Sequence, residues 1–199
     1  MKKYILFSFL LILLFCSSLV NATQISFSSV NVTGSYHNSL NFLTDDIIPG
    51  ESGQWQNNTV WWNGTGTAFT FDMGSSYTLE DIILSVDNND YYRVEYSSDN
   101  SVWNTLFSIS RYDGEIGWGM DTMATSSTHS EYIPAIDFSP VNAQYLRIQA
   151  TGGDNSYSIG EFQAFGEIQS NPVPEPATMF LLGSGLAGLA GFRKKFRKK

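Results

Sequence analysis

The sequence predicts an all-β domain, a jelly-roll β-sandwich, between two apolar ends. Three observations lead to this prediction. Several segments alternate apolar and polar residues with the period of two that half-buried strands require. Turn-forming residues separate these segments at short spacings, and no helical periodicity appears between the two ends. About eight short strands without intervening helices are typical of a sandwich or jelly roll.

The expected strands follow one another along the middle of the chain. The first alternates with one slip, which suggests an edge strand, and the second ends at a glycine. We interpret Asp87–Asp90 as a hairpin turn, because it lacks the glycine and the distal glutamate of a calcium-binding loop, and Ser97–Ser101 as another turn. The expected strands are Ile25–Val32, Ala68–Gly74, Asp81–Val86, Tyr92–Tyr96, Trp103–Ile109, Tyr132–Phe138, Tyr145–Ala150 and Ile159–Phe165.

Two segments, Gly34–Trp62 and Arg111–Ser130, are too long for ordinary connections and are therefore expected to be functional loops. Aromatic rings in such loops can pack against the apolar face of a sugar. Trp61 and Trp103 are instead expected in the core, because they belong to the fold motifs Thr59-Val60-Trp61 and Tyr92–Trp103. The candidate ligand-binding residues are Tyr36, His37, Trp55, Trp62, Tyr112, Trp118 and His129.

Residues 1–22 have the pattern of a secretory signal peptide. Two lysines precede the apolar run Tyr4–Phe15, and small residues then allow cleavage after Ala22. Cys16, the single cysteine, lies in this segment, and Phe15 before it argues against a lipoprotein signal. The exported chain is therefore expected to contain no disulfide bond and no cysteine metal ligand.

The other end of the chain has three parts in a fixed order. Val173, Pro174, Glu175 and Pro176 form a stiff non-helical spacer, since each proline fixes its own φ and restricts the residue before it. An uncharged run at 177–192 and a basic tail at 193–199 follow, which together form a stop-transfer pattern. As a helix the run would reach about 24 Å, short of the ~30 Å hydrocarbon core, and the flanking cations can extend it by snorkelling. A simple membrane anchor is the alternative interpretation.

The charge of the middle region, residues 23–170, limits its partners. Only Arg93, Arg111 and Arg147 are basic there, against eighteen aspartates and glutamates. A surface of this sign repels phosphate backbones, so nucleic-acid binding is not expected. Divalent cations and neutral glycans are compatible partners.

Motifs of catalysis are missing from the sequence. It contains no HExxH, no G-x-S-x-G, no P-loop and no GxGxxG, and both histidines are isolated. Two of the many carboxylates could form a glycosidase pair, but no spacing indicates one. The protein is therefore not expected to be an enzyme.

Residues 171–199 resemble the PEP-CTERM sorting signal of Gram-negative bacteria that make exopolysaccharide. The Pro-Glu-Pro motif, the apolar span and the basic end match that family in order. The resemblance implies export, transient anchoring in the inner membrane, and processing by the membrane protease exosortase near Val173–Pro176. The protein would then remain at the cell surface or outside the cell.

The middle region resembles the discoidin, or coagulation factor 5/8 type C, domain, a galactose-binding-like jelly roll. The resemblance covers about Tyr36–Gly166 and departs from the family at Asp46 and Gln144. The matching pieces, in order, are Asp45, Thr59-Val60-Trp61, Phe69–Gly74, Tyr92–Trp103, Gln144–Ile148 and Ile159–Gly166.

This second resemblance also implies one structural Ca²⁺. The family's ligand positions fall on Asp45, Thr59 and Glu161, with Asp46 as the rival of Asp45. A turn role for Asp45 and a surface-strand role for Glu161 are the alternative interpretation.

The functional hypothesis is a non-catalytic, exported, exosortase-sorted protein whose domain binds carbohydrate, with the cell's own exopolysaccharide as the candidate partner. A structural matrix protein without a specific small ligand is the first alternative. An envelope glycosidase is the second.

Overall fold

The computed structural model describes residues 22–169 and 184–185. The chain divides into two compact units, Met1–Ile168 and Gln169–Lys199. The described part of the first unit is a domain of nine strands and two short 3₁₀ helices. Its strands are β1 Thr23–Ile25, β2 Ser29–Thr33, β3 Val60–Asn63, β4 Ala68–Asp87, β5 Tyr91–Ser97, β6 Asn104–Ile109, β7 Met120–Ala124, β8 Val141–Gly152 and β9 Ser156–Ile168.

The long strand β4 joins two layers, because its two halves pair with different strands. The first half pairs with β2 and β8, and the second half pairs with β9 and β7. The register of the β4–β8 pair shifts between Asp72 and Tyr77. Gly74 lies within this irregularity at a φ of +73°, a conformation that glycine adopts without strain. All pairs are antiparallel, so the predicted sandwich is confirmed.

The core lies between the layers and is rich in aromatic rings. Phe71 of β4 stacks on Phe162 of β9 with ring centroids 4.5 Å apart. Trp62 of β3 is fully buried and contacts Phe69 and Tyr157, with centroid distances of 5.0 and 5.7 Å. These contacts join β3, β4 and β9 and so fix the frame on which the loops sit.

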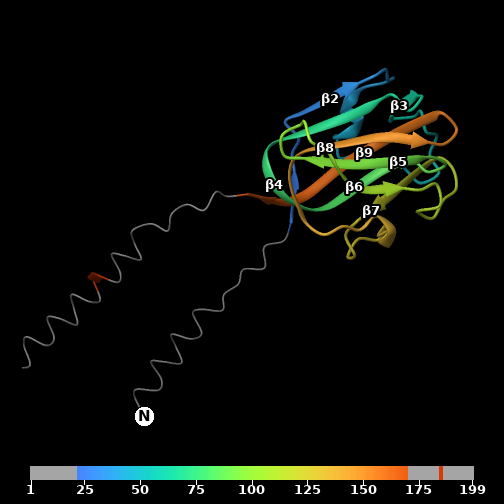
Figure 1. Cartoon of the computed structure of the whole chain (residues 1–199). Coiled ribbons are helices and arrows are strands. Elements are labelled where there is room, and N and C mark those ends of the chain that lie inside the picture. The colour runs from blue at the N-terminus through green and yellow to red at the C-terminus, as the bar shows by residue number, and fades with distance from the viewer. Residues whose placement is uncertain (1–21, 170–183, 186–199) are drawn as a thin grey trace, which may run out of the picture. The chain divides into compact units, whose positions relative to one another are not determined.

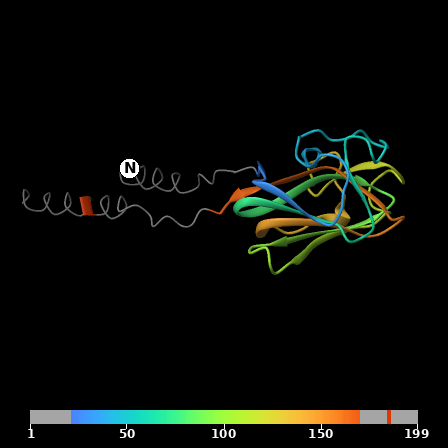
Figure 2. The same cartoon turned by 90° about the horizontal axis from the view of Figure 1, so that it is seen from above.

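Different structural elements lie at the two ends of the domain. Figures 1 and 2 both show β1 and the last residues of β9 at one end, and loops gathered at the other. The loop end combines the β4–β5 turn, the segment between β6 and β7, and the β8–β9 turn. Asn88 N donates to Gly119 O at 3.0 Å and Asp154 N donates to Asp90 Oδ1 at 2.9 Å, so these three connections are held together.

Several expected elements are corrected by the structure. The first expected strand is two strands, β1 and β2, which pair with β9 and β4 respectively. The strands expected at Ala68–Gly74 and Asp81–Val86 are one strand, β4. The turn at Asp87–Asp90 is confirmed as a turn but not as a hairpin, since β4 and β5 do not pair with each other.

The two expected long loops contain regular structure. The first includes a 3₁₀ helix, η1 Leu40–Leu43, and the start of β3. The second includes β7, whose five residues are all buried. A wholly buried strand does not alternate, and so the period-two pattern could not reveal it. The strand expected at Tyr132–Phe138 is instead a segment with the 3₁₀ helix η2 Pro134–Ile136, which begins at a proline.

Residues 1–21 of the expected signal peptide, the sorting motif and the basic tail lie outside the described residues. So does the expected membrane span, except for residues 184–185. In the part of the chain that the structure describes, no helix is long and apolar enough to cross a membrane.

Candidate functional site

A cavity of about 470 Å³ opens at the loop end of the domain. The β4–β5 turn, the β6–β7 segment and the β8–β9 turn all contribute to its walls. Its lining residues are Asn89, Tyr91, Arg111, Tyr112, Gly117, Gly153 and Asp154. We call this cavity the loop-end pocket.

The polar wall of the loop-end pocket is fixed by hydrogen bonds. Asn89 Nδ2 donates to Asp154 Oδ2 at 3.0 Å, while Asp154 Oδ1 accepts from the Ser156 backbone N–H at 2.9 Å. One carboxylate oxygen of Asp154 is therefore oriented by its own turn, and the other by Asn89 of the β4–β5 turn. This arrangement holds an acceptor ready for a hydroxyl or ammonium group of a ligand.

The aromatic wall of the pocket is exposed. Tyr112 has 77% of its surface exposed, and the Arg111 guanidinium lies over its ring at 5.1 Å from the centroid. Trp118, next to the lining residue Gly117, is 64% exposed. Large exposed rings beside a hollow lined with polar groups are the usual features of a ligand site.

Buried acids lie beneath the polar wall. Burial raises the pKa of Asp87 to about 6, with the charge of Asp154 adding to the effect. Burial likewise raises the pKa of Asp90 to about 7, against the backbone hydrogen bond from Asp154. Asp87 and Asp90 therefore place two acidic groups next to the lining residue Asp154, and their negative charge develops as the pH rises through about 6 to 7.

The structure separates the ligand-binding candidates into groups. Tyr112 lines the loop-end pocket and Trp118 lies beside it. His37 stacks on Trp61 at 3.8 Å between centroids, and Trp55 meets the same tryptophan edge-on at 5.3 Å, so these rings pack on one another.

Other candidates need correction or lie elsewhere. The prediction that Trp62 contacts a ligand is wrong, since its side chain is fully buried in the core. Neighbouring residues of a strand face opposite sides of the sheet. Trp62 faces the core, and Trp61, which was the expected core residue, faces away from it and is only half-buried. Tyr36 is 38% exposed and packs edge-on against Phe69 at 6.1 Å. Trp103 is half-buried and lies under the Arg147 guanidinium, 4.1 Å from its ring centroid.

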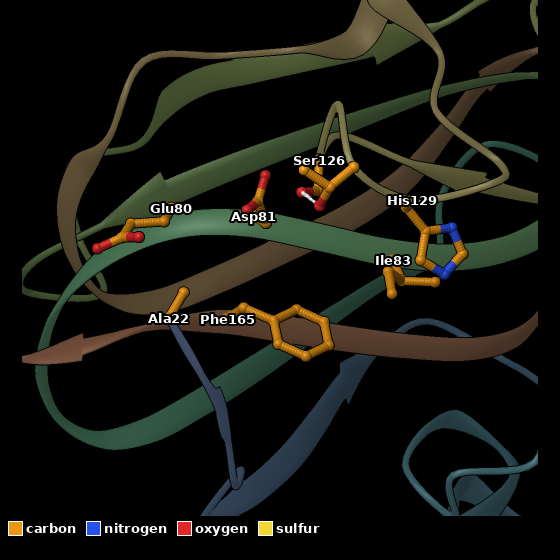
Figure 3. Close-up of a pocket in the computed structure, with 8 residues that line it drawn as sticks. Ala22, Glu80, Asp81, Ile83, Ser126, His129 and Phe165 are labelled. Atoms are coloured by element: carbon orange, nitrogen blue, oxygen red, sulfur yellow. Dashed lines mark hydrogen bonds between the residues drawn. The ribbon is translucent and has the colours of Figure 1, made fainter. Parts of the chain in front are cut away.

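His129 belongs to a separate cavity of about 480 Å³. Figure 3 shows His129 and Ser126 from the segment after β7, Asp81 and Ile83 from β4, and Phe165 from β9 around it. His129 Nδ1 accepts from the Glu131 backbone N–H at 3.1 Å, which orients the ring. Ser126 and Thr128 share a hydrogen bond at 3.1 Å.

The calcium candidates meet around Glu161. This residue is fully buried on β9, and its carboxylate oxygens have no well-aligned hydrogen bond, although the Gln163 side chain and the Asp46 backbone N–H lie near enough to oppose the rise of its pKa. It lines a small cavity of about 150 Å³ together with Thr44 and Asp46. Burial raises the pKa of Glu161 to about 7, and the charges of Asp45 and Asp46 raise it further. A carboxylate that is buried without a cationic partner, near two more, fits a cation site.

The remaining members of the calcium set have other contacts. Thr59 is buried and its hydroxyl donates to the Trp55 carbonyl. Asp45 Oδ1 accepts from the Ile47 backbone N–H at 3.1 Å, and Asp46 Oδ1 accepts from Gln24 Nε2 at 2.6 Å. Within residues 22–169 and 184–185, no three Asp, Glu, His or Cys side chains form a group that could hold a metal. A cation here would therefore need carbonyl or hydroxyl oxygens as well.

Of the seven lining residues, the sequence identifies only Tyr112 as a ligand candidate, and it does not identify Asn89, Tyr91, Arg111, Gly117, Gly153 and Asp154. Asn89 lies in the expected turn and Arg111 and Gly117 lie in an expected long loop, whereas the other three belong to no expected element. A signal was present, since Asp87–Asp90 and Gly152–Asn155 are both rich in turn-forming residues, as Ser97–Ser101 also is. Only the topology, which places the start of β5 beside the end of β8, shows that the first two share one pocket.

Comparisons with known proteins agree with both expected resemblances. The model of the F5/8 type C domain matches residues 24–162, and the model of the PEP-CTERM protein-sorting motif matches residues 172–195. No curated protein sequence matches the chain.

Among solved structures, the chain is similar to a truncated AlyQ with CBM32 and alginate lyase domains. The TM-score is 0.50 at 20% identity, with 76% of this chain and 35% of that one covered, so this chain spans about a third of its length. It is also similar to the CBM32 of AlyQ in complex with 4,5-unsaturated mannuronic acid, with a TM-score of 0.43 at 19% identity, 72% of this chain and 98% of that one covered. A third similar structure is CBM32-1 from a family 31 glycoside hydrolase of Clostridium perfringens. Its TM-score is 0.46 at 14% identity, with 71% of this chain and 96% of that one covered. These likenesses concern the fold.

Proposed function

Because the chain belongs to the F5/8 type C domain family, we propose that its β-domain binds a polysaccharide through the loop-end pocket. The observation that carries this proposal is the combination in one cavity of an exposed tyrosine and fixed polar groups. Tyr112 offers an open ring face, while Asn89 and Asp154 offer oriented hydrogen-bonding groups. Sugars present both an apolar face and hydroxyl groups, so they match both walls.

The charge of the site selects among polysaccharides. Asp154 lines the pocket, and Asp87 and Asp90 lie under it. Arg111 is the one cation among the lining residues, and its guanidinium rests on Tyr112. We infer that the ligand is a neutral or amine-bearing polysaccharide, since an anionic chain would be repelled. The exopolysaccharide of the producing cell is the candidate partner.

The test is affinity electrophoresis of the full-length chain, purified in mild detergent with calcium, through gels that contain dextran, chitosan or alginate. We expect retardation by dextran or chitosan and none by alginate. Tyr112→Ala should weaken the binding by about tenfold, since an aromatic contact contributes on the order of 1 kcal/mol.

Val102→Ala is the matched control, because Val102 is 65% exposed but lies in the turn between β5 and β6, at the other end of β5 from the pocket. It should leave retardation unchanged. If none of the three polysaccharides retards the wild-type chain, the alternative of a structural matrix protein replaces this proposal.

We further propose that the domain holds one structural Ca²⁺ beside Glu161. Glu161 would supply the central carboxylate, Asp45 or Asp46 a second, and Thr59 an oxygen from its hydroxyl or carbonyl. The supporting observation is the buried Glu161 carboxylate, which has no well-aligned hydrogen bond and no cationic partner among the described residues. A bound divalent cation would offset its charge and join β9 to the segment after η1.

The proposal for the C-terminal segment is that exosortase recognises residues 173–176 while the span anchors the chain in the inner membrane of a Gram-negative bacterium. The match to the PEP-CTERM motif supports it. Cleavage would then leave the β-domain at the cell surface or outside the cell. Sorting brings many copies to one surface, so that weak binding to a repeating polysaccharide gains avidity.

Replacement of Pro174, Glu175 and Pro176 by alanine tests the sorting proposal. We expect full-length protein to accumulate in the inner membrane, because the marked spacer is lost while the apolar span is kept. Cell fractionation and immunoblotting measure this outcome. Pro172→Ala, which leaves the motif intact, is the control, and normal processing of the triple variant would contradict the proposal.

A further inference from the structure

Oxygen atoms converge on the side chain of Asn88, beneath the segment between β6 and β7. Asn88 is 1% exposed, and its Nδ2 lies at hydrogen-bond distance from three oxygens. These are Asp113 O at 2.8 Å, Asp121 Oδ2 at 2.7 Å and Ile116 O. An amide nitrogen carries two hydrogens, so it cannot satisfy three acceptors at once.

Asp121 faces this cluster without a full set of partners. It is fully buried, and its Oδ1 atom has no hydrogen-bond partner, as is also true of Asn88 Oδ1. Burial and the charges of Glu51 and Glu115 raise the pKa of Asp121 to about 7. A buried carboxylate surrounded by further acids is unfavourable unless a positive charge compensates it.

The described part of the domain offers no side chain for this purpose. Between residues 22 and 169 the strong cations are three arginines, and lysine does not occur. Arg93 and Arg147 both pair with Glu95, at 3.4 and 2.8 Å, and the Arg111 guanidinium lies over Tyr112. The described residues therefore offer no free cation to Asp121, and either a proton or a cation bound from solution neutralises it.

We propose that the oxygens around Asn88 and Asp121 bind a second divalent cation, Ca²⁺, separate from the one at Glu161. Asp121 would provide the carboxylate, Asp113 and Ile116 their backbone carbonyls, and Asn88 its side-chain oxygen after the amide turns over. The turned amide exchanges a nitrogen for an oxygen of nearly equal size, so the four groups become an oxygen-only set. Oxygen-only sets of carboxylates, amides and carbonyls are the ligands that Ca²⁺ prefers, and Glu51 and Glu115 add negative charge around them.

The proposed cation would organise the loop end. Its ligands come from the β4–β5 turn, from the β6–β7 segment and from the start of β7. Beside the pairing of β4 with β7, Asn88 joins these parts by its backbone N–H to Gly119 and by its amide. A cation would replace these bonds by stronger contacts, and would fix the segment that carries Tyr112.

Calcium titration calorimetry on the full-length chain, stripped with EDTA and held in mild detergent, tests the proposal. We expect two binding events in the wild type, one in Asp121→Asn and one in Glu161→Gln. Asp121→Asn with undiminished calcium binding overturns the inference, and so does a wild type that binds no calcium. A single event that only Glu161→Gln removes would likewise overturn it, while leaving the structural site at Glu161 intact.

Melting curves separate a cation site from a merely structural role. In calcium-free buffer at pH 8, Asp121→Asn should melt several degrees higher than the wild type, because it removes a buried charge, and calcium should raise its melting temperature less. Asn88→Asp should show the reverse, with a lower melting temperature without calcium and a larger rise with it. Equal losses of stability in both variants, with and without calcium, would show that these side chains serve only as hydrogen-bond partners. Asp137→Asn, which removes an exposed carboxylate, is the control and should change neither condition.

Discussion

Trp62 shows how a single side chain can be tested for its role. It is fully buried and contacts Phe69, Tyr92 and Tyr157. Trp62→Ala should lower the free energy of unfolding by about 3–5 kcal/mol, because it leaves a large cavity in the core. Trp118→Ala, at a 64% exposed residue, should change it by less than about 0.5 kcal/mol. Chemical denaturation of both variants measures the difference, and similar losses in the two would contradict the assignment.

Stabilisation of the domain by calcium should depend on the side chain of Glu161. A cation that binds only the folded chain raises stability by about 2.7 kcal/mol at a hundredfold excess over its dissociation constant. Glu161→Gln keeps the shape of the side chain but removes its charge, so it should shrink the rise in melting temperature that calcium causes. Glu167→Gln, a half-buried glutamate of the same strand, is the control. An unchanged calcium-dependent rise in Glu161→Gln would remove this residue from the site.

At the scale of elements, the sequence predicted those strands that alternate. The sequence predicts β5, β6 and β8 within a few residues of their observed bounds, since each has one face on the core and one partly in water. It also predicts β9, whose second half alternates although residues 157–162 are all buried. β7 was missed because all five of its residues are buried, which removes the alternation. The alternating pattern predicts the end of a strand at Gly74, whereas a bend there lets β4 continue into the second layer.

The candidate site could be predicted only in part, because the sequence shows exposed loop aromatics but not which distant residues the fold brings together. Tyr112 and Trp118 were found because exposed aromatics in a loop are visible in the sequence alone. Asn89 and Asp154 are ordinary turn residues until the fold brings them together across 65 residues of chain. Glu161 was identified through family resemblance, and the burial of its carboxylate without a cationic partner is a property that no sequence pattern displays.

At the scale of the whole molecule, the charge of the domain is the dominant feature. Eighteen acids face three arginines between residues 23 and 170, and two of those arginines share Glu95 as their partner. Most of the acids are exposed to water or lie in turns, where repulsion is screened. Asp87, Asp90, Asp121 and Glu161 are instead buried, so their ionisation acts directly on stability.

These four acids give the domain a definite pH dependence. Their pKa values in the folded chain are raised to about 6 for Asp87 and about 7 for Asp90, Asp121 and Glu161, in each case chiefly by burial. In the unfolded chain they titrate near pH 4. The folded state therefore binds more protons between about pH 4 and 7, and stability is lost as the pH rises through this window. Asp99 acts in the opposite sense, since backbone N–H groups of Val102 and Ser101 lower its pKa, and its contribution disappears only in strong acid.

In calcium-free buffer we thus expect the full-length chain to become less stable by a few kcal/mol between pH 5 and pH 8, as measured by denaturant unfolding. Calcium should flatten this decline, because a bound cation holds Asp121 and Glu161 in their ionised forms and competes with protons for them. Asp87 and Asp90 have no place in either proposed cation site, so a smaller decline should remain with calcium present. Asp121→Asn and Glu161→Gln should each reduce the slope without calcium, and Asp137→Asn should not. A stability that rises with pH in calcium-free buffer would show that these buried acids are stabilised in their charged forms by contacts other than a metal ion.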